Sequence, residues 1–474
     1  NTDGLVLKNK YFWALNEQMD ATIGLDYFSR RGFSPNLEFR YLINEESFGD
    51  LSTSYIRDKI SSTDFYNLDW KHQQRWANEI RNVTRIDIER KGFRQRFEDD
   101  LILRTRRTSD SYTFFGKNWS DLAVWFEAEL FKTVEVDQRE SFSRQPEVSF
   151  FYLDRPLGDF PLYFSFDSSY VSFSEEAGSE KNREHRADFL PMVKWPINFP
   201  PYVNLAFSLG LRESVYSKEG AGDTFPRRTL LTGMTVYGPI LSREYSVDSQ
   251  AMKSVKHFVE PRLEYRFVSL EDPDKQVIKR KFDIIDEEGN SNTISLDLSN
   301  RFLAKSFSET GINSLWQIAN LNLGIDYDIA ETRKENDQTS GPKRPFSPIR
   351  LDLKTFFQVA WELNFDASYD TDEGKFDSRN IQFSYHPKEN FEISIEKRFT
   401  SSQNLDYLIG KIRTDLSRKV ALTWSVRYDE ENNRLAENNI RLEYRASCWS
   451  IHFSVIRRLD ATKFFFQIDL KGLG

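Results

Sequence analysis

The sequence predicts an all-β protein, specifically a large antiparallel β-barrel that crosses a membrane. Three observations point to this fold class. Apolar and polar residues alternate over long stretches, turn-forming clusters separate these stretches, and helical periodicity is nearly absent. Of the 474 residues, 15% are aromatic. Disordered chains are poor in aromatic residues, so this chain is expected to fold.

The alternation has a period of two and marks the predicted strands. In residues 420–428, Val420, Leu422 and Trp424 fall on one face, with polar or small residues between them. Residues 321–329 and 357–369 repeat the pattern. Such a period indicates half-buried β-strands, in which successive side chains point to opposite faces.

Polar clusters rich in Asn, Asp, Glu and Gly separate the predicted strands, as in residues 286–292, 334–348 and 429–439. Strands do not alternate with helices along the chain. We therefore do not expect a nucleotide-binding α/β fold.

Three β architectures fit the alternation: a soluble sandwich, a repeat fold such as a propeller, and a membrane barrel. No repeat of fixed length is evident. Charged residues at mid-strand, such as Asp326 and Glu362, suit either the outside of a sandwich or a wet barrel lumen, so they do not discriminate. Chain length favours the barrel, because roughly 18 residues per strand and loop give about 26 strands.

Composition excludes several other classes. The net charge of −8 argues against a nucleic-acid binder. Apolar runs such as Leu122–Phe126 are far shorter than the roughly 20 residues of a spanning helix. Cys448 is the single cysteine, so no disulfide forms within the chain. The chain opens NTDGLVLKNK, without a signal peptide, so we expect that a leader was absent or removed.

We expect no catalytic residue, no cofactor and no metal site. The five histidines are scattered without ligand spacing, and the common nucleophile, phosphate-loop and Cys-x-x-Cys motifs are absent. Consecutive carboxylates, such as Asp286, Glu287 and Glu288, fall between predicted strands. We interpret them as solvated loop charge.

Motifs at both ends and in the middle of the chain carry a family resemblance. Residues 11–42 contain Trp13, a Met-Asp-Ala-Thr run at 19–22 and Glu-Phe-Arg-Tyr-Leu at 38–42; residues 260–262 read Glu-Pro-Arg; and Tyr444, Cys448 and Trp449 precede a final Lys-Gly-Leu at 471–473. In this order they resemble the LptD family of lipopolysaccharide-assembly outer-membrane proteins.

The resemblance implies a 26-stranded barrel in the outer membrane of a Gram-negative bacterium. Residues 1–474 would form this barrel, and the family's N-terminal periplasmic jellyroll domain would be absent. The implied partners are lipopolysaccharide, the plug lipoprotein LptE, and a periplasmic lipopolysaccharide-transport bridge that contacts the jellyroll. The implied function is insertion of lipopolysaccharide into the outer leaflet through a lateral gate between the first and last strands, without catalysis.

The resemblance also assigns gate residues. On the first strand they are Lys10, Tyr11, Phe12 and Trp13, and on the last strand Phe464, Phe465, Phe466 and Ile468. We expect Phe465 on the lumenal side, where it packs on the plug, lines the gate or fills the barrel wall.

Two features depart from the family pattern. Prolines weaken the family's first two strands, but the matching positions here are Lys10 and Leu25, while Pro35 is expected on the third strand. The family cysteine pairs with one in the jellyroll, so the resemblance assigns Cys448 to a disulfide with the absent domain. An alternative role for Cys448 is that of a small turn residue.

Three other functions compete with the translocon. The foremost is a passive porin-like or substrate-specific channel, which needs an open lumen. An outer-membrane lipase or protease would need a Ser/His or Asp/His constellation that we do not find. A soluble carbohydrate binder would not need detergent.

Overall fold

The computed structural model describes residues 3–76, 78–97, 108–133, 140–177, 180–218, 224–247, 252–271, 282–307, 313–333, 343–357, 360–388, 390–403, 405–447, 449–458 and 462–470. Its strands are β1 (Val6–Asn16), β2 (Met19–Phe28), β3 (Gly32–Asn44), β4 (Ser47–Asp58), β5 (Thr63–Arg75), β6 (Arg81–Glu89), β7 (Thr108–Asn118), β8 (Leu122–Thr133), β9 (Glu140–Pro156), β10 (Tyr163–Ala177), β11 (Glu180–Phe199), β12 (Val203–Lys218), β13 (Thr224–Tyr237), β14 (Leu241–Ser246), β15 (Ser254–Glu271), β16 (Ser291–Phe307), β17 (Asn313–Asp328), β18 (Ile349–Phe357), β19 (Trp361–Asp370), β20 (Lys375–Lys388), β21 (Phe391–Thr400), β22 (Leu405–Ser417), β23 (Val420–Asp429), β24 (Arg434–Arg445), β25 (Trp449–Arg458) and β26 (Thr462–Leu470). The helices are short: α1 (Phe93–Phe97), α3 (Ile284–Glu287), α4 (Ile329–Arg333) and the 3-10 turn η1 (Ser401–Gln403).

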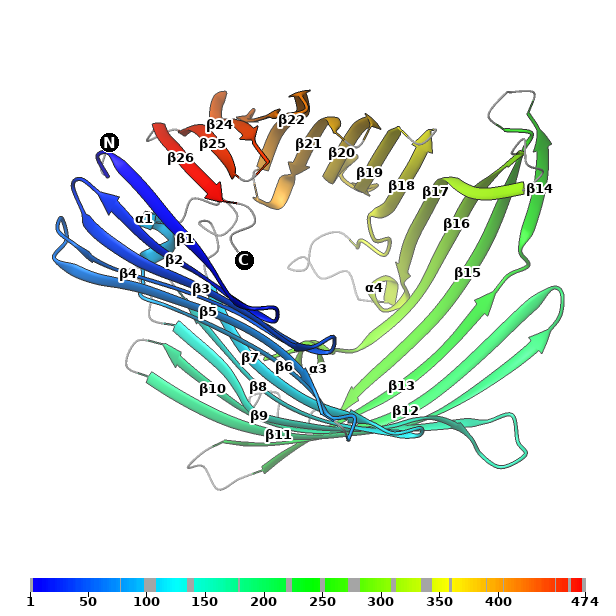
Figure 1. Ribbon diagram of the computed structural model, residues 1–474. Helices are drawn as coiled ribbons and strands as arrows, with labels where there is room; N and C mark the ends of the chain where they lie inside the picture. Colours follow the sequence, from blue (N-terminus) through cyan, green and yellow to red (C-terminus); the bar gives the residue numbers. More distant parts are fainter. Residues whose placement is uncertain are drawn as a thin grey trace.

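The strands form one 26-stranded sheet that curls into a nearly closed barrel, as Figure 1 shows. Apart from β13 and β14, which both pair with β15, neighbours in the chain pair with each other, and every described pairing is antiparallel. The predicted fold class and strand number are therefore confirmed. No helix in the described ranges is long and apolar enough to cross a membrane.

The two faces of the sheet distinguish the barrel from a sandwich. On β12, Leu209 and Leu211 point outward and are 51% and 61% exposed, whereas Ser214 and Tyr216 on the inner face are buried. Large apolar side chains are exposed in this way on strand after strand. An apolar exterior around a polar interior suits hydrocarbon outside and water inside.

Strands β13 and β14 share one edge of the long strand β15. Residues 262–271 of β15 pair with β13, and residues 254–259 pair with β14. The break falls at Pro261, which has no N–H to donate and accepts a bond from the Gly238 amide at 2.9 Å. A Cβ at Gly238 would lie 2.6 Å from the Pro261 ring, so only glycine fits against the proline.

Because β13 and β14 occupy one position, the first and last strands run in the same direction. Of the 25 described pairings, one joins β14 to β15, and the other 24 lead from β1 to β26. An even number of antiparallel steps restores the starting direction. Figure 1 agrees, since β1 and β26 both begin at the upper left of the view and run toward its middle.

Candidate functional site

The site begins with the alternating faces of β1. Tyr11 and Trp13 point outward and are 58% and 50% exposed. Lys10 lies on the opposite face, where its ammonium forms a 2.6 Å ion pair with Glu38 of β3. Phe12 shares that inner face and is partly buried. The four residues predicted for the first strand of the gate therefore divide between two faces of the barrel wall.

Strand β2 separates β1 from β3 and carries the second predicted gate position. Leu25 points outward and is 48% exposed, and it stands opposite Pro35 in the β2–β3 register. The predicted place of Pro35 on the third strand is thus confirmed. Because proline lacks a ladder N–H, Pro35 removes one backbone donor from β3.

The last strand shows the same alternation as the first. Phe464, Phe466 and Ile468 point outward and are 61%, 55% and 48% exposed. Phe465 turns to the other face, and the Lys8 ammonium lies 5.5 Å from the centre of its ring. This contact places Phe465 against the first strand.

The line along which β1 meets β26, hereafter the seam, differs from the other strand contacts. No register between these two strands occurs in the described residues, and side-chain contacts join them. Besides Lys8 on Phe465, the Lys463 ammonium lies 3.8 Å from a carboxylate oxygen of Asp3. Both contacts join the start of β1 to the start of β26, as expected for parallel strands.

Buried charges fix the β1 side of the seam. The Arg31 guanidinium binds Asp3 at 2.6 Å and Asp58 at 2.8 Å, and all three residues are buried. Arg96 of α1 approaches Asp58 at 3.7 Å. Helix α1 packs inside the barrel on an apolar cluster that includes Phe28 of β2. The start of β1 therefore rests on a rigid base, whereas its contact with β26 is slight.

A second buried network holds α3 against the inner wall. Arg186 of β11, which is 1% exposed, binds Asp283 at 2.7 and 2.5 Å and Asp286 at 2.9 Å. Tyr216 donates to Asp286 at 2.6 Å, and Arg212 pairs with Glu288 at 2.5 Å. The interpretation of Asp286 and Glu288 as solvated loop charge was therefore wrong, because the segment folds inward onto basic strands.

The sequence shows this network only as a spacing. Asp283 and Asp286 lie three residues apart, a spacing that can place two side chains on one side of a helical turn, and Glu288 follows directly after the helix. Their partners Arg186, Tyr216 and Arg212 stand on other strands. The strand register decides which basic residues face this segment, and the spacing of the acidic residues does not reveal it.

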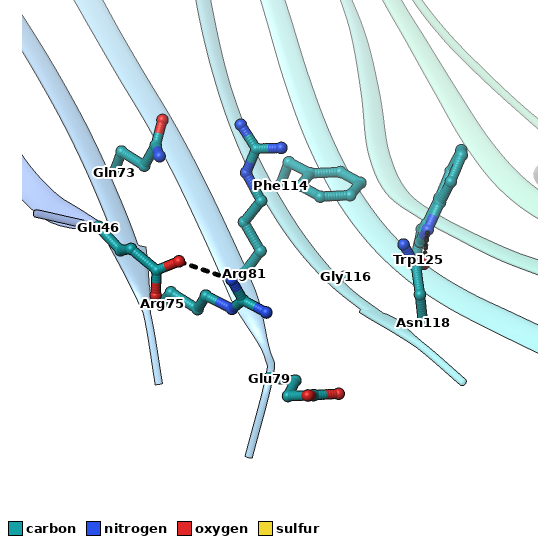
Figure 2. A pocket seen from close by; sticks show the side chains of 9 residues that line it. All are labelled: Glu46, Gln73, Arg75, Glu79, Arg81, Phe114, Gly116, Asn118 and Trp125. Carbon is teal, nitrogen blue, oxygen red and sulfur yellow. Dashed lines mark hydrogen bonds and ion pairs between the residues drawn. The ribbon is translucent and has the colours of Figure 1, made fainter. Parts of the chain in front are cut away.

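A pocket of about 580 Å³ opens far from the seam, at the ends of β5 to β8 (Figure 2). Its charged lining consists of Arg75, Arg81, Glu46 and Glu79, and Arg75 pairs with Glu46 at 2.6 Å. Two cations and two carboxylates cancel, so this pocket has no preference for either sign of charge.

Two predicted features lie outside the described residues: Cys448, and the Lys-Gly-Leu run at 471–473. The disulfide role of Cys448 stays a prediction. In the described part of the chain, no group of three His, Cys, Asp or Glu side chains is arranged to hold a metal ion.

The apolar exterior, the polar interior and the curled antiparallel sheet define an outer-membrane β-barrel protein of Gram-negative bacteria. Within this class, residues 63–408 match the model of one family, LptD, described as LPS transport system D. That match covers most of the chain, and the chain belongs to the LptD family.

Curated relatives agree along the whole chain. The LPS-assembly protein LptD of Haemophilus ducreyi is 22% identical over 97% of this chain and 64% of its own length. The LPS-assembly protein LptD of Nitrosococcus oceani is 24% identical over 100% of this chain and 66% of its own length. The chain thus spans somewhat less than two thirds of several relatives. A solved siderophore receptor, PirA from Pseudomonas aeruginosa, aligns over 99% of this chain with a TM-score of 0.40 and 10% identity.

Proposed function

We propose that this chain forms the barrel of a translocon that inserts lipopolysaccharide into the outer leaflet. In this proposal the lipid leaves the lumen sideways through the seam between β1 and β26. Membership of the LptD family supports lipopolysaccharide as the cargo. The passive-channel alternative is not favoured by these relatives, and no chemical step or catalytic residue is required.

The seam is the observation that carries the proposal. An ordinary barrel is closed by a ladder of backbone hydrogen bonds, and each unsatisfied backbone group in hydrocarbon costs several kcal/mol. Here no register joins β1 to β26 in the described residues, and the contacts across the seam include an ion pair at 3.8 Å and a cation above a ring. Separating β1 from β26 therefore costs less than separating any registered pair of strands.

The two faces of the seam suit an amphiphile. Tyr11, Trp13, Phe464 and Phe466 offer an apolar outer rim for acyl chains. Lys10 and Glu38 give the inner face charges that suit sugars and phosphates. The assignment of Lys10, Tyr11, Phe12, Trp13, Phe464, Phe465, Phe466 and Ile468 to the gate is part of this proposal.

The proposal includes partners. We propose that the plug lipoprotein LptE occupies the lumen of this barrel, and that a periplasmic bridge delivers lipopolysaccharide through a jellyroll domain. Both expectations come from the family resemblance. Co-purification of a lipoprotein with the detergent-extracted barrel tests the first of them.

In-cell photocrosslinking tests the route. A photoreactive residue is placed at Tyr11 or at Phe466, and lipopolysaccharide adducts are then detected with an antibody. The matched control is Phe383 of β20, an outward aromatic that is 38% exposed and far from the seam. Adducts at Tyr11 and Phe466 but not at Phe383 are expected. Equal labelling at all three positions would show contact with bulk outer-leaflet lipid and would refute the gate.

A further inference from the structure

An aromatic patch of Phe114, Trp125 and Phe151 lies on the neighbouring strands β7, β8 and β9. The Trp125 ring centre is 4.5 Å from that of Phe151 and 5.8 Å from that of Phe114. Trp125 shares the face of buried Ala123 and stands opposite buried Ser149, so it points into the lumen. It is nevertheless 38% exposed. An exposed aromatic patch in a polar interior indicates a ligand-binding surface.

Two pockets flank the patch and form one groove. The pocket of about 580 Å³ at β5–β8 and a second pocket of about 370 Å³ toward β11 share Trp125 and Asn118. We call the two together the lumenal groove. It runs from Arg75 of β5 to Lys194 of β11, and Figure 2 shows its first half. Each volume falls within the roughly 300–1,000 Å³ of small-molecule sites.

The Trp125 ring is held in a fixed position. Its Nε1–H donates to the side-chain oxygen of Asn118 at 3.2 Å. Gly116 of β7 stands opposite Trp125, and a Cβ there would lie 3.0 Å from the Trp125 ring and 2.5 Å from the Phe114 ring. The glycine therefore leaves the space that both rings occupy. A ring fixed before the ligand arrives loses little freedom on binding, which favours affinity.

The charges of the groove disfavour an anion. Its described lining has three cations and four carboxylates: Arg75, Arg81, Lys194, Glu46, Glu79, Asp154 and Asp167. Arg75 pairs with Glu46 and Lys194 with Asp154, both at 2.6 Å. The turn between β5 and β6 also contains Ala77, which carries no charge and lies outside the described residues. A neutral ligand therefore suits the groove better than a phosphate does.

Planar hydrogen-bonding groups lie beside the aromatic patch. They are the amides of Gln73 and Asn118 and the guanidinium of Arg81. Figure 2 shows the Arg81 side chain between the Glu46–Arg75 pair and Phe114. A sugar ring has C–H groups on its faces, which pack on an aromatic ring, and hydroxyls around its edge, which both donate and accept. An acyl chain in the same place would leave the polar groups unpaired.

We propose that the lumenal groove binds a neutral oligosaccharide, with one sugar ring stacked on Trp125 and its hydroxyls bonded to Gln73, Arg81 and Asn118. The inference rests on the proposed function for the identity of the ligand in the cell, where it is the sugar chain of lipopolysaccharide. Binding of an oligosaccharide is a property of the barrel itself and is measured without transport.

The test measures binding to the purified chain by saturation-transfer NMR. The detergent has a polyoxyethylene headgroup, because a maltoside headgroup is itself a sugar and would compete. The probes are maltohexaose, its sulfated counterpart, and the neutral oligosaccharides that mild acid releases from lipopolysaccharide. We expect saturable binding of the neutral probes that salt does not weaken, with the strongest transfer to C–H protons of the ring faces. Absence of binding by both neutral probes, or tighter binding of the sulfated one, would overturn the proposal.

Tryptophan variants identify the site. Trp125→Ala should weaken binding about tenfold, because it removes the stacking surface, whereas Trp125→Phe keeps a flat ring and should retain most of the affinity. The matched control is Trp195→Ala. Trp195 is 46% exposed, and it points outward because it follows the lining residue Lys194 on β11. Heat-dependent gel mobility checks that each variant is folded. An unchanged affinity in folded Trp125→Ala would show that the sugar binds elsewhere.

A protein inside the lumen is the other occupant that an aromatic patch suits. The same variants distinguish it, since any lipoprotein that co-purifies with the barrel is quantified in each preparation. If Trp125→Ala loses that protein and keeps its affinity for maltohexaose, the groove is a protein contact and the saccharide site falls.

Photocrosslinking of lipopolysaccharide from Tyr11 separates this inference from the proposed function. If adducts form at Tyr11 while neither neutral probe binds the purified chain, the translocon stands and the saccharide site falls. If Trp125→Ala loses maltohexaose but Tyr11 never forms an adduct, the site stands and the gate falls.

Discussion

At the scale of residues, Asp286 shows how a single side chain attaches a loop to the barrel wall. One of its oxygens accepts from both Arg186 and Tyr216, and the other accepts from the Phe282 amide at 3.0 Å. Glu287, the next residue of the same helix, is exposed. Adjacent acidic residues therefore have different roles, which depend on the face of one helical turn.

This contrast gives a prediction. Asp286→Asn removes the charge that pairs with buried Arg186 and should cost about 2 kcal/mol of local stability. Amide hydrogen exchange at residues 285–287 should then accelerate roughly thirtyfold. Glu287→Gln is the matched control and should leave exchange unchanged. Equal acceleration in both variants would mean that Asp286 does not anchor α3.

The residue scale also shows what sequence reasoning could reach. The outward positions of Tyr11, Trp13, Phe464 and Phe466 follow from the period of two, since alternate residues share a face. The cation beside Phe465 could not be foreseen, because Lys8 is more than 450 residues away in the chain. Contacts across the seam depend on barrel closure, which local periodicity does not encode.

At the scale of elements, α3 is a short helix held by charge rather than by apolar packing alone. Asp283 caps it, accepting from the Ile285 amide at 3.0 Å, and also binds Arg186. Burial alone would raise the pKa of Asp283, but hydrogen bonding and the charge of Arg186 outweigh it and hold the pKa below its usual value. Phe282 stacks on Phe173 of β10 at 4.5 Å and adds an apolar contact.

The lowered pKa predicts that acid releases this element. A depressed folded-state pKa stabilises the docked helix above the unfolded value of about 3.9, and that stability is lost as the pH falls through the folded pKa. A spin label at Glu287→Cys, in a Cys448→Ser background, should be immobile at neutral pH and should become mobile only as the pH falls well below about 3.9. Asp283→Asn should give a mobile label at every pH. A label that stays immobile in strong acid would contradict this coupling.

Sequence patterns located the strands better than they located what lies between them. Alternation marked strands such as β17, β19 and β23, because each has one lipid-facing and one lumenal face. The joint between β13 and β14 was hidden, although its cause, Pro261, stood in the Glu-Pro-Arg motif. A proline indicates a missing hydrogen bond but not which neighbour loses it.

At the scale of the whole molecule, the relative direction of β1 and β26 follows from the number of strand positions around the barrel. The sharing of one barrel position by β13 and β14 leaves 25 positions around the barrel, so β1 and β26 run parallel. Chain length predicted the strand number, and the resemblance predicted which strands meet. The parallel direction depends on one local break between Gly238 and Pro261, and it could not be inferred from the length.

A seam without a ladder of backbone hydrogen bonds should give a distinctive pattern of amide hydrogen exchange along β1 and β26. In a β-strand, the N–H groups of successive residues point alternately to the two neighbouring strands. On β1, every second amide therefore bonds to β2, while the others face β26, with which no register is described. Hydrogen exchange at single-residue resolution in detergent micelles should alternate between slow and fast along β1 and along β26. The matched control is β16, which is registered with β15 on one side and β17 on the other and should be slow at successive residues. Uniformly slow exchange along β1 would reveal a closed ladder at the seam and remove the physical basis for a gate there.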